Sequence, residues 1–96
     1  MQFEWDEAKD RANVAKHGID FETAKRIFDG PVLTWPDRRR DYGEERHIGI
    51  GRVEAATVVV AYTEHGGRLR LISARPASGK ERKAYHGRAY ETPDAG

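Results

Sequence analysis

The residues best suited to bind a ligand form a basic cluster late in the chain. Between residues 66 and 90, one acidic residue, Glu81, accompanies seven basic ones: Arg68, Arg70, Arg75, Lys80, Arg82, Lys83 and Arg88. The net charge of the whole chain is only +1, so the composition conceals this local excess. Such a surface attracts polyanions, and nucleic acid is the first candidate partner. The competing interpretation is a solvated face whose long side chains cover apolar neighbours.

A second basic run, Arg38-Arg39-Arg40, precedes Asp41 in a predicted loop. Loops are polar by default and often carry binding residues. This run could bind RNA phosphates, contact an acidic partner or simply be solvated.

Composition limits the possible classes of protein. The 96 residues predict a single domain over 1–91, followed by a disordered tail over 92–96 that has nothing apolar to bury. The absence of cysteine excludes disulfides, thiolate catalysis and thiolate-bound zinc. No metal or other cofactor is predicted, because the four histidines show no close-spaced pair with a carboxylate of the kind that zinc enzymes use. No signal peptide or membrane span is recognisable, so a cytoplasmic protein is expected.

Two short helices are predicted at the start of the chain. The first runs from about Glu7 to Lys16, with Asp6 as its N-cap and Gly18 as its left-handed stop. Asp20 caps the second, whose apolar positions follow helical spacing: Phe21, Ala24, Ile27 and Phe28. The second helix should end at Asp29-Gly30-Pro31, because proline lacks an N–H and restricts the residue before it.

Four strand-like runs follow, at residues 32–35, 46–51, 57–63 and 68–75. The third is rich in β-favouring residues, and His65-Gly66-Gly67 after it favours a tight hairpin into the fourth. Strict alternation in the fourth places one set of side chains on a common face: Leu69, Leu71, Ser73 and Arg75. These runs predict an antiparallel four-stranded sheet.

A third helix is predicted from Ser78 to about Tyr90, because Ser78-Gly79-Lys80-Glu81 fits a capping box. The predicted fold class is therefore α+β, with two N-terminal helices, the four-stranded sheet and this C-terminal helix. Arg82, Tyr85 and His86 share one face of the third helix by their spacing. This face adjoins the exit of the fourth strand, so these residues are expected to converge with Arg75.

Seven blocks of residues together match a known family. In chain order they are Phe3-Glu4-Trp5-Asp6 with Asn13; Lys16-His17-Gly18 with Phe21-Glu22; Asp37; Glu44-Glu45-Arg46 with Ile48 and Gly51; Tyr62-Thr63-Glu64; Arg70-Leu71-Ile72-Ser73-Ala74-Arg75; and Glu81-Arg82 with Tyr85. Through them the chain resembles the BrnT toxins, which have a RelE-like fold, from residue 3 to about 90. The ordered set is specific, whereas a single block such as Lys-His-Gly would be weak.

The resemblance implies the toxin of a bacterial type II toxin–antitoxin system. Such a toxin is a metal-independent endoribonuclease that cleaves RNA and inhibits translation. It is neutralised by a cognate ribbon-helix-helix antitoxin similar to BrnA, and DNA is bound only through the antitoxin complex. A homodimer within that complex is possible, and no membrane association is implied.

Metal-free cleavage of RNA uses the ribose 2′-hydroxyl as nucleophile and passes through a phosphorane with additional negative charge. Candidate arginines for stabilising that charge are Arg46, Arg75 and Arg82. Proton transfer could come from Glu45, Glu64, Tyr85, His86 or His17, with Tyr85 favoured over the histidines. The residues expected to bind RNA are Arg38, Arg39, Arg40, Arg70, Lys80, Lys83 and His86.

Several candidates also have purely structural interpretations. Glu45 and Glu64 could form cross-strand ion pairs with Arg46 or Arg75. Tyr85 could pack on the sheet, and His17 could complement the negative end of a helix dipole.

Where members of the family commonly have several basic residues after the fourth strand, this chain has Pro76-Ala77-Ser78-Gly79. This departure predicts fewer phosphate contacts and a stiffer turn between Arg75 and Arg82. Two other classes of function remain open: a noncatalytic nucleic-acid-binding domain and a module that binds an acidic protein.

Overall fold

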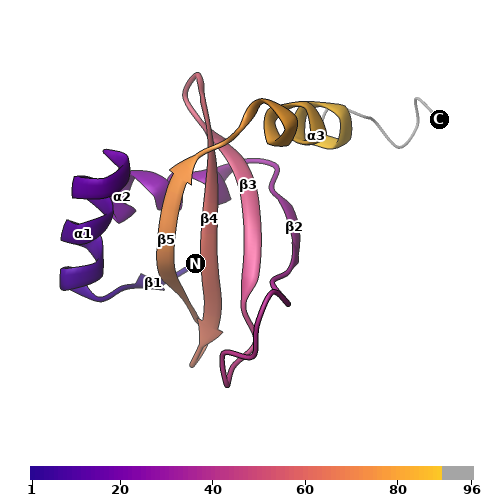
Figure 1. Ribbon diagram of the computed structural model, residues 1–96. Coiled ribbons are helices and arrows are strands. Elements are labelled where there is room, and N and C mark those ends of the chain that lie inside the picture. Colours follow the sequence, from indigo (N-terminus) through magenta and orange to yellow (C-terminus); the bar gives the residue numbers. More distant parts are fainter. Residues whose placement is uncertain (90–96) are drawn as a thin grey trace.

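A computed structural model describes residues 1–89 (Figure 1). Its elements, in chain order, are β1 (Phe3–Glu4), α1 (Glu7–His17), α2 (Phe21–Ala24), the 3₁₀ helix η1 (Lys25–Asp29), β2 (Leu33–Pro36), β3 (His47–Val53), β4 (Ala56–His65), β5 (Arg68–Pro76) and α3 (Gly79–Ala89). The predicted tail over 92–96 and the predicted helix end at Tyr90 lie outside the described residues. No helix within residues 1–89 is long and apolar enough to cross a membrane.

The sheet has five strands in the order β1-β5-β4-β3-β2. The prediction of a four-stranded, wholly antiparallel sheet is wrong at one edge, where β1 pairs in parallel with β5. Phe3 lies opposite Leu69 and Glu4 opposite Arg70. With two residues, β1 is too short to carry a recognisable alternation, and its partner lies more than sixty residues away along the chain. The fold class, α+β, is as predicted.

The helix ends confirm the predicted caps. The Asp6 carboxylate accepts a hydrogen bond from the Ala8 N–H at 2.8 Å, and Gly18 has a left-handed φ of 74°. The Asp20 carboxylate accepts from the Thr23 N–H at 2.7 Å. The second helix differs from the prediction, because its α-helical part ends at Ala24 and continues as the 3₁₀ helix η1. These local bonds explain why the caps could be read from sequence.

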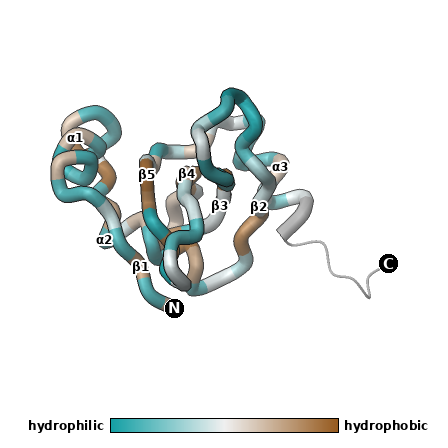
Figure 2. Tube along the Cα trace, turned by 90° about the horizontal axis from the view of Figure 1, so that it is seen from below, coloured by the Kyte–Doolittle hydropathy of each residue, from teal (hydrophilic) through white to brown (hydrophobic). Residues whose placement is uncertain are grey.

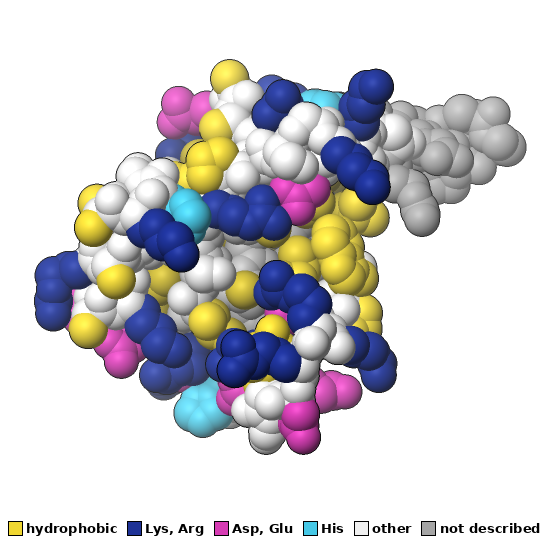
Figure 3. Space-filling model, in the orientation of Figure 1, with side chains coloured by type: hydrophobic (Ala, Val, Ile, Leu, Met, Phe, Trp, Pro, Cys, Tyr) yellow, Lys and Arg dark blue, Asp and Glu magenta, His cyan; other side chains and the backbone are white. Residues whose placement is uncertain are grey.

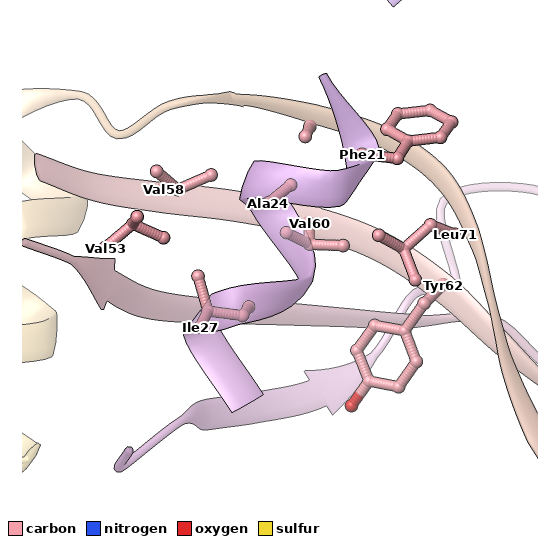
Figure 4. Packing of buried hydrophobic residues seen from close by; sticks show 9 residues of the cluster. Phe21, Ala24, Ile27, Val53, Val58, Val60, Tyr62 and Leu71 are labelled. Atoms are coloured by element: carbon pink, nitrogen blue, oxygen red, sulfur yellow. The ribbon is translucent and has the colours of Figure 1, made fainter. Parts of the chain in front are cut away.

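The helices cover the two faces of the sheet unequally. α1 and α2 lie on one side and α3 at the other, next to β2 (Figures 1 and 2). The larger core joins α2 and η1 to the sheet, and Figure 4 shows its packing: Phe21, Ala24, Ile27, Val53, Val58, Val60, Tyr62, Leu71 and Ala74. The smaller core lies on the opposite face, under α3: Ile48, Ile50, Val59, Ala61, Ala77 and Tyr85.

A β-bulge in β5 decides which of its side chains lie on which face. Ala61 is opposite Ser73, whereas Tyr62 is opposite Leu71, so Ile72 has no residue directly opposite it. The predicted strict alternation is therefore wrong, because an extra residue in one strand reverses the alternation beyond it. Arg70 pairs with Thr63 and Arg75 with Val59, two residues of β4 that share a face. The bulge thus places Arg70 and Arg75 on the same face of the sheet.

α3 begins with the predicted capping box. The Glu81 N–H donates to Ser78 Oγ at 3.1 Å, and the Ser78 N–H donates to Glu81 Oε1 at 2.9 Å. Farther along, Tyr85 inserts into the smaller core and its hydroxyl donates to the Pro31 carbonyl at 2.9 Å. These contacts attach α3 to the smaller core, next to β2 and β3.

Candidate nucleic-acid interface

A hollow of about 220 Å³ lies between α3 and the loop that follows β2, on the side of the sheet carrying the smaller core. It is lined by Trp35, Pro36, Asp37, Arg38, Arg39, Ile48, Arg75 and Glu81. We call it the central hollow. Figure 3 shows Lys and Arg side chains spread over one face of the molecule, with a few acidic and hydrophobic side chains between them.

Arg75 enters the central hollow from β5 and is held by Glu81 of α3. Its Nη1 and Nη2 donate to Glu81 Oε1 and Oε2 at 2.7 and 2.8 Å. Two parallel charge-assisted hydrogen bonds orient the planar guanidinium group and lower the pKa of Glu81 to about 2. Arg75 Nη1 also donates to the Pro76 carbonyl at 3.3 Å. The side chain is still 43% exposed, and Nε and the second N–H of Nη2 are left to bind a ligand.

Arg39 enters the same hollow from the loop, where Asp37 orients it. Arg39 Nε and Nη2 donate to Asp37 Oδ1 and Oδ2 at 2.8 and 2.9 Å, and the Tyr42 hydroxyl also donates to Asp37 at 3.1 Å. The hydrogen bonds from Arg39 hold the pKa of Asp37 far below its usual range despite the burial of this carboxylate. The hydrogen bonds to Glu81 raise the pKa of Arg75, and the charge of Arg39 opposes this rise. Arg39 and Arg75 line the same hollow.

A second hollow, of about 350 Å³, lies within the loop itself and shares Pro36, Asp37 and Arg38 with the central hollow. Its other lining residues are Arg40, Asp41, Tyr42, Glu44, Glu45, Arg46 and His47. Arg46 lies 4.0 Å from the centroid of the Tyr42 ring and forms a salt bridge with Glu44 at 3.2 Å. Arg46 therefore contributes to this loop hollow and does not line the central one.

Arg70 belongs to a third group, centred on Glu4 of β1. Arg70 Nη1 lies 2.7 Å from Glu4 Oε2, His65 Nδ1 lies 2.9 Å from the same oxygen, and Arg68 lies 3.7 Å from Glu4 Oε1. The hydrogen bonds from Arg70 and His65 lower the pKa of Glu4. Glu4 thus partly neutralises this end of the basic cluster.

Basic residues of α3 form a separate shallow hollow with Gly79: Lys80, Arg82, Lys83 and His86. Arg82 Nη1 donates to the Ala77 carbonyl at 3.0 Å. The predicted convergence of Arg75, Arg82, Tyr85 and His86 is confirmed for Arg82 and His86, which share this hollow, and is wrong for Arg75 and Tyr85, since Arg75 lines the central hollow. Tyr85 is 1% exposed and belongs to the smaller core, as its structural interpretation predicted.

The predicted proton-transfer residues are spread widely. Glu45 lines the loop hollow, and its carbonyl accepts a hydrogen bond from Thr63 Oγ1 at 2.6 Å. Glu64 is opposite Leu69 and lines another hollow, beside Phe28 and Tyr62. His17 occupies the last turn of α1. The suggested cross-strand ion pairs of Glu45 or Glu64 with Arg46 or Arg75 are wrong. Arg46 instead pairs with Glu44, and Arg75 pairs with Glu81.

Several residues that hold the arginines or line these hollows were not among the predicted site residues, including Glu4, Trp35, Asp37, Tyr42, Glu44 and Glu81. Glu4 and Asp37 belong to the blocks that carry the family resemblance, so the sequence did mark them as candidate functional residues. Trp35 and Tyr42 could not be distinguished from core aromatics without the backbone. Within residues 1–89, no group of three or more His, Asp or Glu side chains is arranged to hold a metal ion.

Comparison with known proteins gives a single informative result. A search of curated proteins found no match. A family model described as the ribonuclease toxin, BrnT, of type II toxin–antitoxin systems matches residues 5–81. The match covers most of the chain, including both hollows that adjoin the loop, and it ends in the first turn of α3. By this match, the chain belongs to the BrnT family of ribonuclease toxins.

Proposed function

We propose that this protein is a metal-independent endoribonuclease that cleaves cellular RNA, inhibits translation and is neutralised by a cognate antitoxin. The observation that carries this proposal is the pair of arginines at the central hollow, Arg39 and Arg75. Each is oriented by two hydrogen bonds to a carboxylate. In a chain of a ribonuclease family, preorganised guanidinium groups on an open face are suited to a phosphodiester.

The proposed reaction is attack by a ribose 2′-oxygen on the adjacent phosphorus. The phosphorane that forms carries more negative charge than the substrate, and a guanidinium group that stays protonated stabilises it. Arg39 and Arg75 each use two N–H groups on their carboxylates and have others left for phosphate oxygens. The bond to the 5′-oxygen then breaks, which yields a 2′,3′-cyclic phosphate and a 5′-hydroxyl.

Glu45 is the proposed acceptor of the 2′-hydroxyl proton. It lines the loop hollow, which shares Arg38 with the central one, whereas Tyr85 is buried and Glu64 lies in another hollow. Glu45 also lies within the matched residues, as Arg39 and Arg75 do, while Arg82, Tyr85 and His86 lie beyond them. The leaving 5′-oxygen takes its proton from water. The proposed role of Lys80, Arg82, Lys83 and His86 is to bind RNA phosphates.

A type II system pairs its toxin with an antitoxin, and we propose a ribbon-helix-helix antitoxin for this chain. Its acidic residues would cover the central hollow, and the antitoxin would supply any DNA binding. The proposed location is the cytoplasm, where RNA substrates and ribosomes are found.

The test is to incubate the purified protein with mixed RNA in the presence of a metal chelator. The comparison variant is the double substitution Arg39→Ala, Arg75→Ala. A matched control, Arg11→Ala with Lys16→Ala, removes the same charge from exposed positions on α1. We expect cleavage by the native protein and by the α1 control, with 2′,3′-cyclic phosphate ends, and a loss of cleavage in the first variant.

Two results would contradict the proposal. Equal cleavage by all three proteins would place the active site elsewhere, provided that each is folded. Salt-dependent RNA binding without cleavage, also in the presence of ribosomes, would favour a noncatalytic binding domain.

A further inference from the structure

Trp35 lies on the face of the sheet that carries Arg75. It is opposite Ile48 of β3, which is opposite Ala61 of β4, and Ala61 is opposite Ser73 of β5. Directly opposed residues of antiparallel strands project to the same side. Ile48 and Ala61 belong to the smaller core, so the indole of Trp35 stands at the edge of that core.

The exposure of Trp35 sets it apart from the other aromatic side chains. It is 40% exposed, and among the Phe, Tyr and Trp residues within 1–89 it is the only one classed as exposed. The other tryptophan, Trp5, packs edge-on against Phe21 beside the larger core. Tryptophan and arginine are enriched at binding interfaces, so an exposed Trp35 that lines a hollow together with arginines marks a candidate binding surface.

Trp35 shares the central hollow with three arginines. Arg38 and Arg39 come from the loop, and Arg75 comes from β5. The hollow measures about 220 Å³, below the ~300–1,000 Å³ of sites that enclose a whole drug-sized ligand. A flat apolar ring beside guanidinium groups therefore fits one planar base, with the attached phosphates lying against the rim.

This combination distinguishes among possible occupants. An acidic peptide would use the arginines but has no general need for the indole. In double-stranded RNA the bases are stacked on each other and cannot reach an aromatic side chain. An unpaired nucleotide uses both features, because its base stacks on an aromatic ring while its phosphates pair with arginines.

We infer that Trp35 is a stacking platform for one unpaired base of single-stranded RNA, with Arg38 and Arg75 placed to bind the phosphates on either side of that base. This inference rests on the proposed function and adds a substrate class to it. Trp35 is a positioning residue in this role, because it orients the nucleotide and exchanges no proton with it.

The test measures binding separately from cleavage. A 2′-O-methyl oligonucleotide lacks the attacking hydroxyl, so it binds without being cut. Its affinity is measured for the native protein and for Trp35→Ala, Trp35→Phe and a control, Val14→Ala, which alters an exposed apolar side chain on α1. The ligands are a single-stranded oligomer, the same oligomer with abasic positions, and its duplex.

We expect Trp35→Ala to lower the affinity for the single strand about tenfold, equivalent to ~1.4 kcal/mol, because the base loses the aromatic ring on which it stacks. Trp35→Phe should retain most of the affinity, and Val14→Ala all of it. Abasic and duplex ligands should bind the native protein and Trp35→Ala equally. The single strand should also quench the tryptophan fluorescence of the native protein, and the quenching should vanish in Trp35→Phe, where Trp5 remains.

Unchanged affinity and persistent quenching in the Trp35 variants would overturn this inference while leaving the ribonuclease proposal intact, and Trp35 would then be a contact for the antitoxin or for a second copy of the chain. If the native protein neither binds nor cuts any RNA, the proposed function fails and the inference fails with it. Thermal unfolding of each variant separates a loss of binding from a loss of fold.

Discussion

Arg75, near the end of β5, and Glu81, in the first turn of α3, form a two-point salt bridge with N–O distances of 2.7 and 2.8 Å. The same Glu81 carboxylate accepts the Ser78 N–H and so closes the cap of α3. One side chain therefore both starts the helix and orients the arginine proposed to bind phosphate. The geometry of the central hollow depends on the attachment of α3 to the sheet.

Replacing Glu81 with Gln should destabilise the protein by about 1–2 kcal/mol, because the charge-assisted bonds to Arg75 are lost while part of the cap remains. Urea denaturation measures the change. Glu22→Gln is the matched control, since Glu22 forms a more exposed salt bridge with Lys25, and such pairs contribute about 0.2–0.5 kcal/mol. Equal effects of the two substitutions would contradict a structural role for the Arg75–Glu81 pair.

The same pair predicts a specific dependence of stability on pH. The pKa of Glu81 is about 2 in the folded protein, compared with its ordinary value of 4.5. A lowered pKa stabilises the fold above pH 4.5, and this contribution is lost as the pH falls from about 4.5 toward 2. Other carboxylates with a lowered pKa, such as Asp37, also respond to acid. The difference between native protein and Glu81→Gln isolates this group: it should shrink across that window, and a constant difference would contradict the prediction.

Replacing Arg75 with Ala should make RNA binding less sensitive to salt. Each neutralised phosphate on a single strand contributes about 0.7 to the slope of log affinity against log salt concentration. The slope should therefore fall by about that amount for a single lost phosphate contact. Arg11→Ala removes the same charge from α1 and serves as the control. The result that would count against Arg75 as a phosphate ligand is a slope equal to that of the control.

Asn13 of α1 takes the place of a neighbouring strand beside β5. β1 pairs with β5 only at Leu69 and Arg70. Farther along, the Asn13 carboxamide accepts from the Ala74 N–H at 3.0 Å and donates to the Ala74 carbonyl at 2.8 Å. Asn13→Ala should cost roughly 2–3 kcal/mol, because it leaves buried backbone groups without partners. Chemical denaturation measures the free energy of unfolding, and Val14→Ala, at an exposed position, is the control. A loss of stability below about 0.5 kcal/mol would show that water replaces the carboxamide.

Gly51 of β3 allows η1 to pack closely on the sheet. A Cβ atom at this position would lie 2.6 Å from Ile27 Cβ and 3.2 Å from the Ile27 carbonyl oxygen. Gly51→Ala should therefore destabilise the fold by about 1–3 kcal/mol through overpacking. Gly87→Ala in α3 is a suitable control, since the new methyl group meets nothing within 4 Å, and higher helix propensity should stabilise it by up to about 1 kcal/mol. Thermal unfolding should shift in opposite directions for the two variants.

Features set by contacts between near neighbours could be predicted without the structure. The caps at Asp6, Asp20 and Ser78 each use a hydrogen bond that spans two or three residues. The hairpin glycines Gly66 and Gly67 take positive φ angles, which glycine adopts without steric cost. Such preferences exist wherever the same few residues occur together, so the three helices, the hairpin and the order of the four longer strands could be predicted from them. The family also followed, because its blocks are local patterns in fixed order.

Which side chains share a surface depends on contacts between segments far apart in the chain. The parallel pairing of β1 with β5 and the bulge at Ile72 depend on register between distant segments, and a shift of one residue moves a side chain to the opposite face. For this reason Arg70 lies on the same face as Arg75, while Glu64 lines a different hollow. α3 packs on the sheet and buries its own Tyr85 in the smaller core, but it leaves Trp35 of β2 exposed. A linear pattern identifies arginines and aromatics as suited to RNA, but the fold selects which of them can act together.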